Sequence, residues 1–93
     1  MTDRPAPPSA IRNIGPKMEA SFRTAGLDTA DEIRGVGADN AYALLLASGH
    51  RAHFMAYVAL VLGLMDRPWN DLGPEEKRAL RARFDALKTA APA

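Results

Sequence analysis

The spacing of apolar side chains predicts helices along almost the whole chain. Apolar residues recur every three to four positions from Pro16 to Ala25, and again in the last quarter of the sequence. No run alternates apolar and polar residues over the length of a strand, and no cluster of β-branched residues is long enough to form one. We therefore predict an all-α, compact five-helix domain, with helices over about 16–25, 29–34, 39–48, 54–65 and 74–88.

Local signals predict where these helices begin and end. Thr29 and Glu32 have the spacing of a capping box, in which each side chain satisfies a free backbone N–H group. Gly26 and Gly49 are expected to end the helices before them, because glycine accepts the left-handed conformation. Residues 54–65 are apolar on all sides, which predicts the buried central helix of the domain. A membrane-spanning helix needs about 20 apolar residues, so this segment is too short to be one.

Composition narrows the class of protein. A chain of 93 residues forms one small domain, and its net charge of +1 excludes binding by bulk positive charge while allowing a local basic face. The chain has no cysteine, and its first ten residues lack the apolar segment of a secretory signal. We expect a cytoplasmic protein with a disordered arm over residues 1–9, an ordered domain over 10–89 and a flexible tail over 90–93.

Two glycine turns form a faint internal repeat. The segments "NIGPK" (13–17) and "GVG" (35–37) each precede a helix, and the branched residues Ile14 and Val36 are expected to fit between the helices that the turns connect. The first turn either is only a tight helix start or holds an anion, because the free N–H groups of a helix N-terminus attract phosphate. In the second turn Asp39 follows closely and would compete for the same donors, so the first turn is the better candidate. The residues proposed to bind nucleic acid are Arg12, Asn13, Gly15, Lys17 and Arg23.

The remaining polar and aromatic residues are mostly explained by structure rather than by a binding or catalytic function. Trp69 is a candidate for binding a protein partner, since tryptophan is common at interaction hot spots. His50 and His53 have no acidic or thiol ligand nearby, so we expect no metal site, and His50 is better explained as part of a helix end. The cations of the last helix are interpreted mainly as a solvated face. We find no catalytic set, no cofactor motif and no small-molecule site, and we predict that the protein is not an enzyme.

The order of these motifs resembles the C-terminal domain of the TfoX/Sxy family of competence regulators. The resemblance covers about residues 11–82 and rests on "NIGPK", "DTADEIR", "GVGA", "GHR" and "WNDLGPEEK". It implies a small all-α unit of helix-hairpin-helix kind, here as a stand-alone domain, and a link to transcriptional control of DNA uptake. In hairpins that bind DNA, glycine usually precedes the apolar residue as well as following it, and here Asn13 stands at that first position.

Two functions follow as hypotheses. The first is a regulatory module that binds the phosphates of duplex DNA weakly and without sequence preference, through the first hairpin. The alternative is a protein-interaction or dimerisation domain that binds no nucleic acid, for which the apolar 54–65 helix and Trp69 are the basis. No membrane association is expected.

Overall fold

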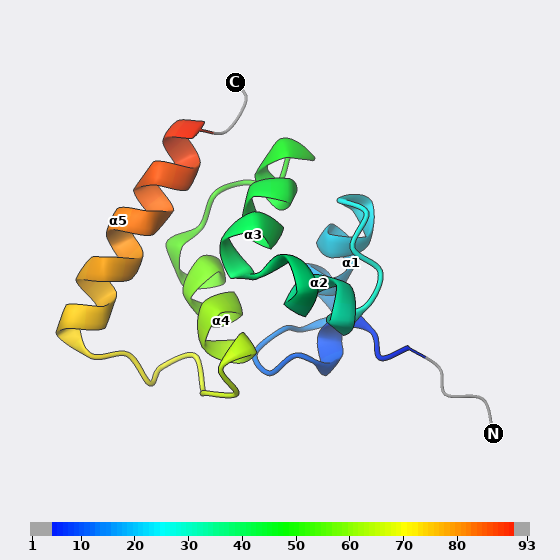
Figure 1. The fold of residues 1–93 in the computed structure, drawn as a ribbon, viewed down its shortest axis with the longest axis horizontal. Coiled ribbons are helices and arrows are strands. Elements are labelled where there is room, and N and C mark those ends of the chain that lie inside the picture. The colour runs from blue at the N-terminus through cyan, green and yellow to red at the C-terminus, as the bar shows by residue number, and fades with distance from the viewer. Residues whose placement is uncertain (1–4, 91–93) are drawn as a thin grey trace.

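The computed structural model describes residues 5–90, and its helices pack around one core (Figure 1). Within that range it has five α-helices, a short 3-10 helix and no strand, which confirms the all-α, five-helix prediction. The elements are η1 (Pro8–Ala10), α1 (Pro16–Thr24), α2 (Ala30–Val36), α3 (Ala38–Ala47), α4 (Phe54–Leu64) and α5 (Pro74–Ala90).

Helix α4 lies at the centre, as its uniformly apolar sequence predicts. Figure 1 shows α3 and α4 in the middle, α5 along one side, and α1 and α2 on the other. Tyr57 and Leu60 of α4 are fully buried, and α4 packs against both α3 and α5. The exposed apolar residues at its two ends are Met55 and Met65. Because most of α4 is covered by the rest of the domain, little of this helix remains free to bind a partner.

The helix ends follow the local rules that the sequence suggested. The Thr29 hydroxyl accepts a hydrogen bond from the Glu32 N–H at 3.1 Å, which caps α2. Gly49 has a φ of 97°, and the next N–H group, from His50, donates to the carbonyl of Leu45. This left-handed glycine ends α3 as expected.

The first turn lies against α4. Ile11 and Ile14, on either side of Asn13, are both buried in the core. Gly63 of α4 is required at the point of contact, because a Cβ atom there would overlap the carbonyl oxygen of Arg12 and lie 3.1 Å from Ile11 Cγ2. The turn is therefore held by close contact between its own backbone and that of α4.

The second turn differs from its prediction. Val36 is not enclosed between α2 and α3 but is 37% exposed. The physical reason is the backbone of Gly37, whose φ of 86° starts α3 immediately after α2 and leaves Val36 at the outer edge of the turn. Ile14, by contrast, is buried as expected. The helix-hairpin-helix character of the two turns remains a prediction.

The N-terminal segment takes part in the packing. Residues 1–4 of the expected arm, and residues 91–93 of the expected tail, lie outside the described residues. Pro8 is fully buried, and the Ala6 carbonyl accepts a hydrogen bond from the Ala30 N–H at 2.9 Å. Packed structure therefore begins before residue 9, earlier than the proline-rich composition indicates, because buried Pro8 contributes to the domain interior.

Candidate nucleic-acid interface

Asn13 serves the structure of the first turn. Its φ of 72° is in the left-handed region, the conformation that glycine would adopt most easily. Its side-chain amide donates to the carbonyls of Ala59, at 3.2 Å, and Arg67, at 2.9 Å, and its side-chain oxygen accepts the N–H of Trp69 at 3.1 Å. The side chain thus joins the turn to α4 and to the loop after it. All these bonds are internal, so Asn13 has little capacity left for a ligand.

Arg12 is also engaged within the protein. Its guanidinium donates to the carbonyl of Asp66 at 3.3 Å and lies 3.9 Å from the carboxylate of the same residue. The Arg12 side chain remains 48% exposed, so the ion pair is weak. Asp66 nevertheless reduces the positive charge that Arg12 presents to an anion.

Gly15 and Lys17 lie at the start of α1, where Gly15 is partly buried and Lys17 is exposed. Gly15 is the N-cap residue, makes no side-chain cap, and has ordinary extended dihedral angles. A Cβ atom at this position would meet nothing within 4 Å, so neither conformation nor packing requires glycine here. The missing side chain leaves the backbone of the first turn open to solvent, and Lys17 is exposed beside it.

One carboxylate acts against anion binding at this helix start. Glu19 lies in the first turn of α1 and accepts the backbone N–H of Ser9 at 3.0 Å. The hydrogen bonds from Ser9 are the main reason why the pKa of Glu19 is lowered. Glu19 therefore remains ionised near neutral pH and partly offsets the charge of Lys17.

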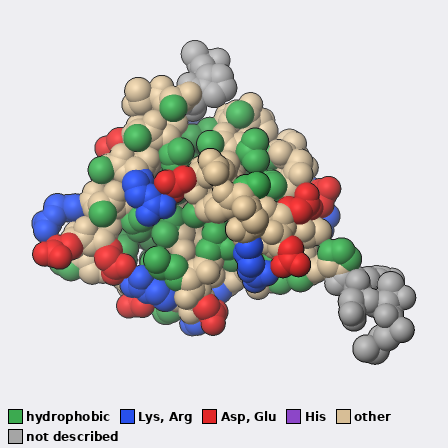
Figure 2. Space-filling model, viewed as in Figure 1, with side chains coloured by type: hydrophobic (Ala, Val, Ile, Leu, Met, Phe, Trp, Pro, Cys, Tyr) green, Lys and Arg blue, Asp and Glu red, His purple; other side chains and the backbone are tan. Residues whose placement is uncertain are grey.

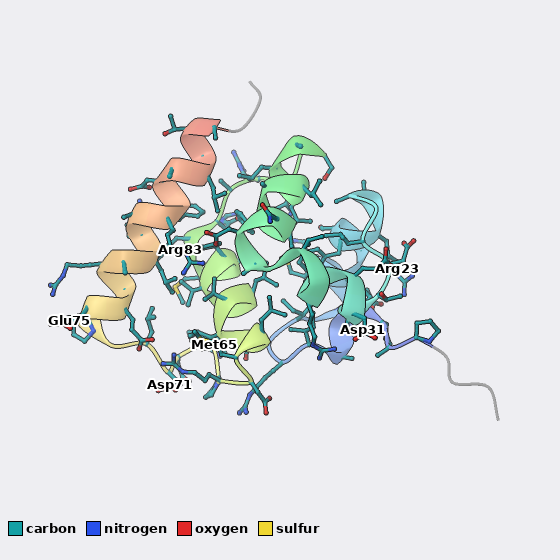
Figure 3. The ribbon with its side chains drawn as sticks, in the orientation of Figure 1. Arg23, Asp31, Met65, Asp71, Glu75 and Arg83 are labelled. Atoms are coloured by element: carbon teal, nitrogen blue, oxygen red, sulfur yellow. The ribbon has the colours of Figure 1, made fainter. Side chains whose placement is uncertain are left out.

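Arg23 lies apart from the other predicted residues. It is in the last turn of α1, six positions after Lys17, which corresponds to about 9 Å along the helix axis. Figure 3 shows Arg23 and Asp31 on the side of the domain away from α5. The five predicted residues therefore do not converge on one ligand, and Gly15 and Lys17 are the two best placed to bind one.

The loop between α3 and α4, residues 48–53, lies beside α1, the helix that carries Lys17. Ser48, Gly49 and His50 of this loop, called the histidine loop below, line one hollow together with Ser21 and Thr24 of α1. The pKa of His50 is lowered chiefly by burial, and further by the positive charges of His53 and Lys17. Arg51, between the two histidines, is exposed. This loop leads directly into Phe54, the first residue of α4.

The loop is held in place by Tyr42. The hydroxyl of Tyr42 donates to the His53 carbonyl at 3.1 Å and accepts the His53 N–H at 2.9 Å. His50 packs edge-on against the Tyr42 ring, with 6.1 Å between the ring centres. Its buried Nε2 atom has no hydrogen-bond partner among the described residues. His50 is therefore mainly a packing residue. This differs from its predicted role as a cation at the end of α3, because burial lowers its pKa and favours the neutral ring.

The cations of α5 fall into two groups. Arg83 is neutralised by Asp39, at 2.6 Å, and Lys88 lies 3.7 Å from Asp85. Lys77, Arg78 and Arg81 line a hollow of about 470 Å³ between α5 and Phe54, and of these three Arg81 also lies 3.4 Å from Asp85. The sequence shows these three cations but not the aromatic ring beside them, because Phe54 comes from a different helix.

A second hollow has an apolar lining. It measures about 550 Å³ and lies between α2, α3 and α5, where Val36 and Leu44 are 37% and 40% exposed. Figure 2 shows hydrophobic side chains over α3 and between α3 and α5, and no histidine is visible on this face. Sequence analysis missed this hollow, because Val36 was expected to be buried.

Trp69 lies in neither hollow. It is 55% exposed and follows α4 in the loop that Asn13 contacts. Its exposure is compatible with binding a partner, but its position next to Asn13 also gives its backbone a structural role.

Comparison with known proteins identifies the family of the chain. The sequence model of the TfoX C-terminal domain matches residues 9–84, most of the 93-residue chain. No curated protein and no solved structure matches. Among the described residues, no helix combines the length and apolar character needed to cross a membrane.

Proposed function

Because the chain belongs to the TfoX C-terminal domain family, we propose that it is a non-catalytic regulatory module that binds the phosphates of duplex DNA without reading the bases. The observation that carries this proposal is the position of Lys17. It is exposed at an uncapped helix start, on the helix whose residues Ser21 and Thr24 share a hollow with the histidine loop, where His53 and Arg51 are also exposed.

The physical basis is the electrostatics of a helix N-terminus. The first N–H groups of α1 and the positive end of its dipole favour an anion, and Lys17 adds a full charge. The absence of a side chain at Gly15 lets a phosphate approach the backbone. Glu19 opposes binding, so the affinity should be modest.

The test is an amide chemical-shift titration with a short duplex at low and at physiological salt. We expect shifts centred on Gly15 and Lys17 that weaken as salt rises. For about three neutralised phosphates, the logarithm of the binding constant should fall with a slope of about −3 against the logarithm of salt concentration. Lys17→Glu should abolish binding, whereas Arg23→Glu, the same charge change at the other end of α1, should weaken it much less. Equal losses in the two variants would mean that the hairpin is not the site.

A second candidate function is protein interaction or dimerisation. The buried α4 helix no longer supports it, but the apolar hollow beside Val36 and Leu44 does, since exposed apolar patches commonly mark interfaces. The chemical-shift titration distinguishes the two functions. Shifts at Val36 and Leu44 that depend on protein concentration, with none on adding DNA, would favour dimerisation.

A further inference from the structure

The hollow beside α5 combines positive charge with an aromatic surface. It lies between the start of α4 and the first half of α5, and it is lined by Phe54, Pro74, Lys77, Arg78 and Arg81. The four α5 residues fall at positions i, i+3, i+4 and i+7 and therefore share one face of the helix. Its volume of about 470 Å³ falls in the range of small-ligand sites.

The charge in this hollow is largely free. In residues 5–90 no carboxylate forms an ion pair with Lys77 or Arg78, and only Arg81 has a partner, Asp85, at 3.4 Å. Elsewhere on the same helix, Arg83 is neutralised by Asp39. The two cations of α5 without a carboxylate partner in the described residues, Lys77 and Arg78, thus lie together in its first half, where they favour an anionic ligand although Glu75 and Glu76 precede them.

The aromatic part is the ring of Phe54, which is only half-buried. The guanidinium of Arg81 lies 5.1 Å from the centre of this ring, and Phe84 meets the ring edge-on at 5.4 Å. Unpaired bases stack on aromatic rings and on arginine planes, while nearby cations bind the backbone of the strand. Bases inside a duplex are already stacked on one another and cannot use such a surface.

We propose that this hollow binds an unpaired nucleic-acid strand, with one base against Phe54 and Arg81 and the backbone phosphates on Lys77 and Arg78. The inference rests on the proposed function in that both concern nucleic acid, but it uses different residues. The histidine loop connects the two regions, since His50 lines a hollow with Ser21 of α1, one helical turn after Lys17, and the loop ends at Phe54.

The test measures binding of a fluorescent oligothymidylate by anisotropy and compares it with a duplex of equal length. Arg78→Glu should weaken oligothymidylate binding by about tenfold or more, because it replaces a phosphate contact with a repulsive charge. Phe54→Leu keeps an apolar side chain but removes the ring, and it should cost about tenfold, within the range of one base stack. Arg34→Glu, an exposed cation on α2, is the matched control and should have little effect. Circular dichroism would establish that each variant is folded.

The outcomes separate this inference from the proposed function. If Arg78→Glu binds oligothymidylate as tightly as the unaltered protein, the inference is overturned. It is also overturned if folded Arg78→Glu loses binding while folded Phe54→Leu binds as tightly as the unaltered protein. Competition by polyglutamate as effective as that by unlabelled oligothymidylate would also overturn it, by showing a general anion site. If Lys17→Glu abolishes duplex binding while Arg78→Glu leaves the oligothymidylate bound, the hairpin proposal stands and the hollow proposal fails. If Lys17→Glu still binds the duplex while Arg78→Glu loses the oligothymidylate, only the hollow proposal is supported.

Discussion

Replacing Gly63 with alanine tests whether close contact between backbones holds the first hairpin against α4. An alanine Cβ would lie well inside 3.0 Å of the Arg12 carbonyl oxygen, 3.1 Å from Ile11 Cγ2 and 3.2 Å from the Arg12 carbonyl carbon. Two of these three atoms belong to the backbone and cannot rotate away. The segment that contains Ile11 and Arg12 would therefore have to move away from α4.

The size of the effect follows from opposing contributions. Alanine favours a helix over glycine by about 1 kcal/mol. Overpacking of a core costs about 1–3 kcal/mol. Displacing the turn would also strain the hydrogen bonds from Asn13 to Ala59 and Arg67, each of which contributes about 1 kcal/mol. We expect a net destabilisation of about 2 kcal/mol or more, which corresponds to a decrease in Tm of about 10 °C for a domain of this size.

Urea denaturation monitored by tryptophan fluorescence measures this change. Trp69 is the one tryptophan in the chain, and its backbone N–H donates to the side-chain oxygen of Asn13, so its fluorescence reports on the same junction. Gly35→Ala is the matched control, because Gly35 lies in α2 and a Cβ there would meet nothing within 4 Å. That variant should be more stable by up to about 1 kcal/mol. If Gly63→Ala is as stable as the unaltered protein or the control, the close contact does not hold the turn.

Two further perturbations test other contacts. Asn13→Ala should lower the free energy of unfolding by about 2 kcal/mol in the same urea assay, because it removes the hydrogen bonds to the part-buried carbonyls of Ala59 and Arg67 and places alanine at a positive φ, whereas Asn13→Gly should cost less. The pKa of Asp39 is lowered below 3.8, mainly by its hydrogen bond from Arg83 and also by one from Tyr57. As the pH falls, the Asp39 carboxylate is therefore protonated in the unfolded chain before it is protonated in the folded one. The contribution of Asp39 to the free energy of unfolding is complete above pH 3.8 and is lost as the pH falls through the folded-state pKa. Arg83→Met should make the loss of stability between about pH 5 and about pH 2 shallower; a curve parallel to that of the unaltered protein would contradict this assignment.

The limits of the helices were open to prediction because they depend on neighbours along the chain. A capping box needs only Thr29 and Glu32, and the end of α3 needs only the left-handed Gly49 and the carbonyls just before it. The central position of α4 followed from its lack of any polar face. Such features involve a few consecutive residues, so their physics is already complete in the sequence.

The candidate sites depended on residues that are far apart in the sequence. The sequence suggested that Asn13 is available to a ligand. In the structure its side chain is hydrogen-bonded to the backbone of Arg67 and Trp69, which only the folded chain brings beside it. The cations of α5 appeared to be an ordinary solvated face until Phe54, from another helix, was placed next to them. The sequence by itself determined which helices form and which residues carry charge. The tertiary structure decided which of those charges are neutralised and which face an open hollow, because pairing and exposure are set by packing between helices rather than within them.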